Sequence, residues 1–191
     1  MKLVFATHNK NKFREVKPLM PSYIELLNLE DIGCAEEISE TANTIEGNAL
    51  MKSRFIKDSY GFDCFADDTG LEVESLKNAP GVYSARYAGD DCDTNANISK
   101  LLGELKNRSN RNARFKTAIS LSIDQKEFMF IGICNGEIIK EPKGELGFGY
   151  DPIFRPRGFE NTFAEMLLEQ KNIIGHRGKA TRKLIEFLSK E

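Results

Sequence analysis

The sequence predicts a domain of the α/β class with a partly antiparallel sheet, and three observations support this. Apolar residues make up 40% and charged residues 29% of the 191 residues, which suits a folded core. Short apolar runs typical of strands alternate with segments of helical periodicity. Two long strand-like segments near the middle of the chain are separated only by a tight turn. The length favours a single domain over residues 1–191, or at most two small lobes.

The first elements are predicted from short local patterns. A continuous apolar run within Lys2–Thr7 predicts a buried strand. Apolar residues at spacings of three and four predict a helix over Asn9–Met20, which Pro18 limits because proline removes a backbone donor. Tyr23–Leu29 is expected to form a second strand.

Thr44–Tyr60 carries the clearest helical pattern. Thr44 can cap its first turn, and Gly61 follows its last. Lys52 falls on the apolar stripe of this helix, which leaves two interpretations. Its stem packs inside while its ammonium group reaches water, or the charge is delivered into a cleft.

The remaining elements follow the same periodicities. In chain order we expect strands over Cys64–Asp67 and Leu71–Glu74, a helix over Asp93–Lys106, strands over Ala113–Asp124 and Glu127–Ile139 around a turn at 124–126, and a helix over His176–Ser189.

Composition excludes several classes of protein. The 27 Lys and Arg against 29 Asp and Glu give a net charge of −2, unlike a duplex-DNA binder, so we expect no nucleic-acid partner. No apolar run approaches the roughly 20 residues of a membrane span, and none near the start suits a signal peptide. Four scattered cysteines and two histidines argue against a zinc site and favour a reducing cytoplasm.

Candidate phosphate-binding residues lie between the first strand and the first helix. They are Thr7, His8, Asn9, Lys10, Asn11 and Lys12. Backbone N–H groups at a helix start attract anions, and the side chains here add donors and positive charge. The alternative is an ordinary strand-to-helix turn that Asn9 caps. The segment is not a P-loop, since GxxxxGK[ST] is absent.

Two adjacent carboxylates, Asp67 and Asp68, end an apolar strand and precede Thr69 and Gly70. Neighbours on a strand point to opposite faces, so both can face one cleft only if the backbone turns there. Carboxylates near phosphates usually hold Mg²⁺, which prefers oxygen ligands. The alternative is a solvated acidic turn.

A glycine-rich segment, Gly144–Pro152, presents Phe148 between glycines. Glycine allows positive φ and close approach of a ligand, and a phenyl ring offers a stacking face to a planar base. The alternative is a structural turn, and the spacing does not fit the dinucleotide fingerprint GxGxxG.

Three basic residues, Lys171, His176 and Arg177, precede or open the last helix. All three donate hydrogen bonds, which suits carbonyl or phosphate acceptors, although a solvated basic surface is the alternative. Taken together, the four sets provide phosphate donors, a metal carboxylate, a stacking ring and base donors. That combination points to a nucleoside triphosphate.

The same residues resemble a known family, the inosine/xanthosine triphosphate pyrophosphatases. The matching motifs are FATHNKNK, GNALMK, FADDTGLEV, PGVYSARYAG, GFGYDPIF, AEM and EQKNIIGHR, in the family's order over nearly the whole chain. The resemblance implies an elongated mixed sheet with flanking helices, two lobes around a central cleft, and a homodimer. It also implies Mg²⁺-dependent hydrolysis of XTP, ITP and dITP to the monophosphate and pyrophosphate, which cleanses the nucleotide pool.

The resemblance also implies roles for individual residues. Asp68 would be the general base and a metal ligand, Thr7 to Lys12 would hold the triphosphate, and Thr69 would contact substrate. Phe148, Gly149, Tyr150 and Asp151 would hold base and sugar, while Lys171, His176 and Arg177 would recognise the purine. From the residues themselves, Lys10, Lys12 and Lys52 would stabilise the departing pyrophosphate, and either Asp67 or Asp68 could accept the proton of water.

Two positions depart from the family pattern. Serine stands at position 39, where many bacterial relatives have a metal-binding acid, so Glu40 or Glu37 would supply a second ligand if one exists. Gly175 replaces a serine before His176. Two other functions are kept open: a Maf-type nucleotide pyrophosphatase, and a non-catalytic nucleotide-binding or RNA-binding regulator.

Overall fold

The computed structural model describes residues 1–190, which divide into two compact units. Unit 1 comprises residues 1–68, 117–132 and the segment from His176 onward, and unit 2 comprises 69–116 and 133–175. Three long strands contribute residues to both units: β3 (Cys64–Val73), β5 (Asn112–Ile123) and β6 (Lys126–Ile138).

A mixed sheet of seven strands forms the framework, in the order β2-β1-β3-β5-β6-β7, with β4 paired to β3. β1 (Lys2–Phe5) pairs in parallel with β2 (Glu25–Leu27) and with β3. β4 (Pro80–Gly81) and β7 (Phe154–Pro156) pair antiparallel with β3 and β6. The α/β class with a partly antiparallel sheet is therefore confirmed.

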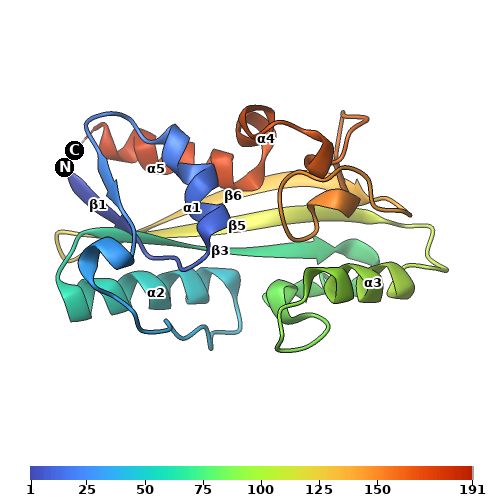
Figure 1. Ribbon diagram of the computed structural model, residues 1–191, viewed down its shortest axis with the longest axis horizontal. Coiled ribbons are helices and arrows are strands. Elements are labelled where there is room, and N and C mark those ends of the chain that lie inside the picture. Colours follow the sequence, from blue (N-terminus) through green and yellow to red (C-terminus); the bar gives the residue numbers. More distant parts are fainter. Residues whose placement is uncertain (191) are drawn as a thin grey trace. The chain divides into compact units, whose positions relative to one another are not determined.

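In unit 1 the strands carry apolar side chains on both faces, and helices cover each face (Figure 1). Along β1, Leu3 and Phe5 enter one hydrophobic cluster while Val4 enters another. The first cluster receives side chains of α1 (Lys10–Val16) and α5 (His176–Leu188). The second receives those of α2 (Ile45–Tyr60). Because both faces of β1 are buried, its sequence is a continuous apolar run and not an alternation of apolar and polar residues.

The bounds and both caps of helix α2 agree with the helix predicted over Thr44–Tyr60. The Thr44 hydroxyl accepts a hydrogen bond from Gly47 N at 3.0 Å, and Gly61 ends the helix with a φ of 75°. The predicted helix over Asn9–Met20 is divided: α1 ends at Val16, and a 3₁₀ turn containing Pro18 follows. Proline cannot donate the next α-helical hydrogen bond, which accounts for the change.

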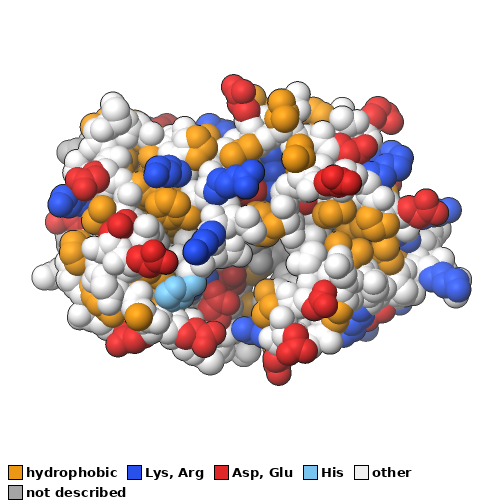
Figure 2. All heavy atoms as spheres, viewed as in Figure 1, with side chains coloured by type: hydrophobic (Ala, Val, Ile, Leu, Met, Phe, Trp, Pro, Cys, Tyr) orange, Lys and Arg blue, Asp and Glu red, His pale blue; other side chains and the backbone are white. Residues whose placement is uncertain are grey.

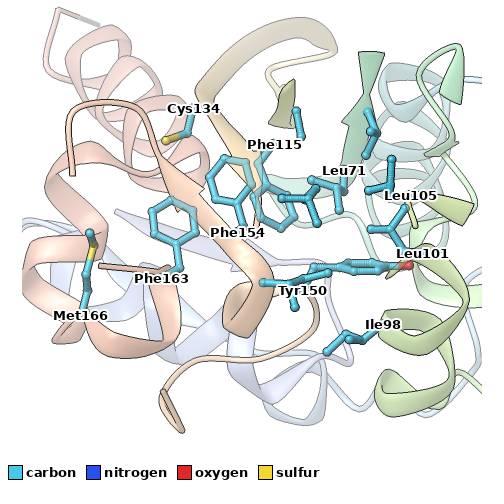
Figure 3. Packing of buried hydrophobic residues seen from close by; sticks show 14 residues of the cluster. Leu71, Ile98, Leu101, Leu105, Phe115, Cys134, Tyr150, Phe154, Phe163 and Met166 are labelled. Carbon is cyan, nitrogen blue, oxygen red and sulfur yellow. The ribbon is translucent and has the colours of Figure 1, made fainter. Parts of the chain in front are cut away.

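Unit 2 is built around an aromatic core (Figure 3). The Phe154 ring lies 4.7 Å from Phe115 and 5.1 Å from Phe163, centroid to centroid. Helix α3 (Thr94–Glu104) adds Leu101, and its first turn is capped by Asp93, as the predicted helix start implies. Helix α4 (Leu168–Ile174), like β4 and β7, was not predicted from the sequence.

One sequence prediction was wrong. Cys64–Asp67 and Leu71–Glu74 were expected to be separate strands, yet β3 runs unbroken through Thr69 and Gly70, which also excludes the alternative of a solvated acidic turn. Pairing with neighbouring strands at both ends holds the glycine in extended backbone. The β5–β6 turn, by contrast, lies where expected, with Asp124 and Gln125 both at positive φ, as a two-residue hairpin loop requires.

The remaining local elements are short 3₁₀ turns, at Lys17–Leu19, Glu30–Ile32, Glu74–Leu76, Ser84–Arg86, Asp151–Ile153 and Phe163–Glu165. Within residues 1–190, no helix is both long and apolar enough to cross a membrane. Acidic and basic side chains are interspersed on the face drawn in Figure 2, in keeping with the small net charge.

Candidate active site

The unbroken course of β3 sends Asp67 and Asp68 to opposite faces of the sheet. Phe65 belongs to the cluster on the α1 and α5 side, whereas Cys64 and Ala66 belong to the cluster on the α2 side. Because side chains alternate along a strand, Asp67 must share the first face and Asp68 the second. Their partners confirm this, since Asp67 contacts α1 and α5 while Asp68 contacts α2.

Asp67 is fully buried between two cations. Its Oδ1 lies 3.0 Å from Lys12 Nζ, and its Oδ2 accepts a hydrogen bond from Arg177 Nε at 2.8 Å. Burial alone raises the pKa of this carboxyl, but the charges of Lys12, Arg177 and Lys52 outweigh it and hold the pKa well below its usual range. Asp67 is therefore a firmly ionised group.

Arg177 completes a buried chain of charges. Its Nη1 pairs with Glu15 of α1, so one guanidinium joins two carboxylates from different elements. Burial on its own lowers the pKa of Arg177, but Asp67 and Glu15 reverse this effect and raise the pKa. Because two of its nitrogens are held in this way, the guanidinium plane has a fixed orientation.

Asp68 has a different environment. It is 7% exposed, and its Oδ2 accepts a hydrogen bond from Asn48 Nδ2 at 3.1 Å. Burial raises the pKa of Asp68, and the negative charge of Glu40 raises it further. The positive charges of Lys12 and Lys52 lower this pKa, but the net shift is upward. A carboxylate with a raised pKa accepts a proton more readily than its neighbour Asp67 does.

Lys52 is buried rather than extended into water. It is 5% exposed and forms an ion pair with Glu40. Burial lowers its pKa, but Asp68, Glu40 and Asp67 together raise it above the ordinary value, so the ammonium stays charged. The interpretation in which the ammonium group reaches water is therefore excluded, and the charge lies inside the protein beside carboxylates.

The segment from Thr7 to Lys12 combines a helix cap with an inward lysine. The Asn9 side chain accepts hydrogen bonds from Asn11 N at 2.9 Å and Lys12 N at 3.2 Å, so Asn9 is the N-cap of α1. His8 Nε2 donates to Glu36 O at 2.8 Å, and Lys10 is exposed. Burial lowers the pKa of Lys12, with Asp67 opposing the shift and Lys52 adding to it.

Unit 2 holds a separate group of predicted residues around Asp151. The buried Lys171 ammonium pairs with Asp151, whose Oδ2 also accepts a hydrogen bond from Phe148 N at 2.8 Å. Lys171 Nζ lies 5.0 Å from the centroid of the Phe148 ring. The loop can close in this way because Gly147 has a φ of 76°, and a Cβ there would lie 2.1 Å from Asp151 Oδ2.

Three further predicted residues lie in unit 2. Tyr150 is buried and donates to Ser84 O at 2.9 Å, and Gly149 has a φ of 61°. Thr69 follows Asp68 directly on β3 and is half-buried. Gly175 stands where the family pattern has a serine, and a Cβ there would meet Lys171 O at 2.5 Å.

The three basic residues that the sequence groups together are divided between the units. Lys171 belongs to unit 2, whereas His176 and Arg177 open α5 in unit 1. His176 is buried, and its Nδ1 forms a hydrogen bond of 2.6 Å with Thr117 Oγ1.

Sequence reasoning missed three members of these groups: Glu15, Asn48 and Thr117. Asn48 precedes Lys52 by one helical turn, and that spacing could have placed it beside the same carboxylates. Glu15 and Thr117 carry no local signal, since their partners are 162 and 59 residues away.

The carboxylates of unit 1 can be tested for a fit to Mg²⁺. Within residues 1–190, no three His, Cys, Asp or Glu residues gather as a metal site. Mg²⁺ needs fewer protein ligands, because it is commonly held by one or two carboxylates together with substrate phosphates. Asp68 and Glu40 fit that requirement, because they lie close enough for the charge of Glu40 to raise the pKa of Asp68. Glu37, by contrast, is exposed at the surface.

Comparisons with known proteins agree on one family. The model of the Ham1 family matches residues 3–187. A protein named dITP/XTP pyrophosphatase from Christiangramia forsetii is 61% identical over the full length of both chains. One of the same name from Bacillus subtilis is 43% identical over 97% of this chain and 96% of its own.

Solved structures give the same result. The Ham1 protein of Staphylococcus aureus superimposes with a TM-score of 0.90 at 38% identity, over 99% of this chain and 98% of its own. A HAM1 protein of Coxiella burnetii superimposes with a TM-score of 0.92 at 34% identity over the whole of both chains.

Proposed function

The chain belongs to the Ham1 family, and on that premise we propose that it hydrolyses dITP, ITP and XTP to the nucleoside monophosphate and pyrophosphate. Relatives that carry the name dITP/XTP pyrophosphatase support a nucleoside triphosphate pyrophosphatase. In a cell, this reaction would remove non-canonical purine nucleotides from the pool. A nucleotide-binding regulator without catalysis would have no need for a buried carboxylate with a raised pKa.

The observation that carries the proposal is the arrangement of charges around Asp68. A buried carboxylate of raised pKa lies with Lys12, Lys52 and Asn48, and Lys12 comes from the segment that the resemblance assigns to the triphosphate. Hydrolysis at the α-phosphorus needs charge neutralisation and positioning more than covalent participation by the enzyme. The lysines can neutralise the phosphate charge, and Asp68 can position the attacking water.

Asp68, and not Asp67, is the proposed general base. A base must be able to take a proton near the working pH, and Asp67 is held ionised by Lys12 and Arg177. Asp68 has a raised pKa and accepts a hydrogen bond from Asn48. Asp68 would therefore orient the attacking water and accept its proton.

The lysines neutralise the phosphate chain. Lys52 is buried with a raised pKa, Lys12 is partly buried beside the same carboxylates, and Lys10 is exposed and can contact the outer phosphates. Together with the donors of Thr7, His8, Asn9 and Asn11, they would stabilise the negative charge that grows on departing pyrophosphate. Thr69, next to Asp68, would contact the substrate.

Mg²⁺ is the proposed cofactor, and Asp68 and Glu40 are the residues that would hold it. When bound, it supplies positive charge to phosphate oxygens and favours deprotonation of water. Lys52 pairs with Glu40 and so holds that carboxylate beside Asp68.

Recognition of the base is assigned to donors and to one ring. Phe148 offers a face on which any purine can stack, and Gly149, Tyr150 and Asp151 shape its loop. Lys171, His176 and Arg177 donate hydrogen bonds, and the partners of Arg177 hold it rigid. A rigid donor that bonds a 6-oxo group has no acceptor when adenine, which carries an amino group there, is bound. Leaving that donor unpaired costs about 1–3 kcal/mol of binding free energy.

The test is the product released from ITP by the purified chain with Mg²⁺. We expect pyrophosphate and IMP, with a fall of at least about 100-fold in turnover for Asp68→Asn. Asp58→Asn, which removes an exposed carboxylate on α2, should behave as the parent chain does. Orthophosphate as the first product would indicate a phosphatase, and binding without release would indicate a regulator; either result overturns the proposal.

We also propose a homodimer in the cytoplasm. Large apolar side chains of unit 2, including Tyr83, Leu167 and Ile173, are more than half exposed, which favours burial against another surface. Sedimentation at twice the chain mass of 21.5 kDa supports the dimer, and sedimentation at the single mass refutes it.

A further inference from the structure

Unit 2 contains a basic cavity outside the residues assigned to the substrate. Its volume is about 430 Å³, and it lies where α3 ends, β5 begins and β6 has just ended. The lining residues are Leu102, Lys106, Arg108, Ser109, Arg111 and Lys140. Four of these six are cations and none is acidic.

Arg111 forms a rigid part of this lining. Its Nε, Nη1 and Nη2 donate to Ile138 O, Leu105 O and Ile139 O at 2.6, 2.9 and 2.9 Å. A guanidinium has five N–H groups, so three bonds leave two for a ligand. All three acceptors are neutral carbonyls, which fix the side chain without compensating its charge.

The other cations also lack a carboxylate partner. Arg108 donates to Glu104 O and Ser75 O, which are again backbone oxygens. In the described chain, no ion pair joins Lys106, Arg108, Arg111 or Lys140 to an acidic side chain. Burial lowers the pKa of Arg111, and the charge of Glu137, itself paired with Arg155, opposes this only in part.

Helix capping explains part of this arrangement. The two arginines reach carbonyls at the end of α3, where positive charge is favourable. Lys106 and Lys140 make no such contact in the described chain, although they bring two further like charges to the same cavity. Like charges repel, so the cluster raises the free energy of the unliganded chain and an anion would lower it.

We propose that this cavity is a second binding site, specific for a small phosphate anion with several negative charges. The fixed guanidinium of Arg111 would donate from the wall, and the exposed Lys106, Arg108 and Lys140 would close around the ligand. Phosphate oxygens match guanidinium donors in geometry and lysine in charge. The ligand is either free pyrophosphate or the phosphate group of a nucleotide. The site does not depend on the proposed function, because it shares no residue with the candidate active site.

Hydrogen–deuterium exchange of the full chain with inorganic pyrophosphate tests the site by location. We expect slower exchange in residues 102–112 at low ionic strength and a loss of this protection as salt is added. The double variant Lys106→Gln and Lys140→Gln should need at least about ten times more pyrophosphate to give the same protection of residues 102–112. The control variant Lys126→Gln and Lys143→Gln removes the same charge from exposed positions outside the cavity, and the protection of residues 102–112 by pyrophosphate should be unchanged.

Two comparisons separate the sources of the anion and the two sites. Protection by pyrophosphate but not by a nucleoside monophosphate identifies a free polyphosphate, and the converse identifies a nucleotide phosphate. Lys52→Met should leave protection of 102–112 unchanged, whatever it does to hydrolysis. Protection confined to residues 7–12, 40–52 and 67–69, or weakened equally by both double variants, overturns the second site while leaving the proposed function untouched.

Discussion

Asp67→Asn and Asp68→Asn are isosteric changes at adjacent positions, and they should have different consequences for the stability of the fold. Asp67 lies fully buried between Lys12 and Arg177, and its lowered pKa means that the folded state favours its charge. The asparagine leaves two buried cations without that charge. Removal of one partner from a buried ion pair costs about 3–5 kcal/mol, so Asp67→Asn should destabilise the fold by that amount.

Asp68→Asn should leave stability nearly unchanged. The raised pKa of Asp68 means that the folded state disfavours its charge, so a neutral side chain removes an unfavourable interaction. The amide oxygen can still accept the hydrogen bond from Asn48. We expect a free energy of unfolding within about 1 kcal/mol of the parent chain, together with the loss of turnover that follows from losing the base.

Thermal unfolding combined with pyrophosphate release measures both effects. For a chain of this size, 1 kcal/mol shifts Tm by roughly 2–4 °C, so Asp67→Asn should melt roughly 6–20 °C lower and Asp68→Asn within a few degrees of the parent. If Asp67→Asn melts with the parent chain, or if Asp68→Asn is the less stable variant, the assignment of the two carboxylates to different roles is wrong.

Three further predictions follow from single side chains. Lys52→Met should reduce kcat/KM for ITP by roughly 10- to 150-fold, whereas Lys57→Met, which removes a lysine further along α2, should change it little; equal losses would contradict a phosphate role for Lys52. Phe148→Ala should reduce kcat/KM for ITP, XTP and GTP by similar factors, roughly 5- to 150-fold, and a selective loss for one base would exclude simple stacking. Burial raises the pKa of Cys64 to about 12, so an aromatic disulfide reagent at pH 8 should titrate one thiol of the four, Cys92, until the chain is denatured; rapid labelling of more than one native thiol would disagree with the structure.

Local signals predicted the elements that depend on them. Helix α2 has an N-cap hydroxyl, an apolar stripe and a terminal glycine, and the structure confirms all three. The course of β3 depends on its neighbours instead, since pairing with β1 and β4 joins what the sequence predicted as two separate strands. Propensity is a weak guide where strands on both sides determine the backbone.

The candidate site was predictable by residue type but not by arrangement. The sequence marked Lys52 because it interrupts an apolar stripe, Lys12 because it lies in a basic segment at a helix start, and Asp67 and Asp68 because they end an apolar strand. It did not separate the roles of the two aspartates, because the partner of Asp67 comes from position 177, 110 residues away. Lys171 and Arg177 are near neighbours in sequence, yet they belong to different units, and no periodicity carries that information.

The position of Arg177 also affects when unit 1 can be completed during synthesis. Unit 1 is assembled from three separate stretches of chain, and the helix that carries Arg177 is the last of them to leave the ribosome. Until then, Glu15 and Asp67 lack the cation that joins them, and such distant contacts form late because long loops must close first. Both stretches of unit 2, by contrast, precede that helix. A nascent chain would therefore hold the aromatic core of unit 2 before the buried charges beside Asp68 are in place, so unit 1 is completed only after α5 has been synthesised.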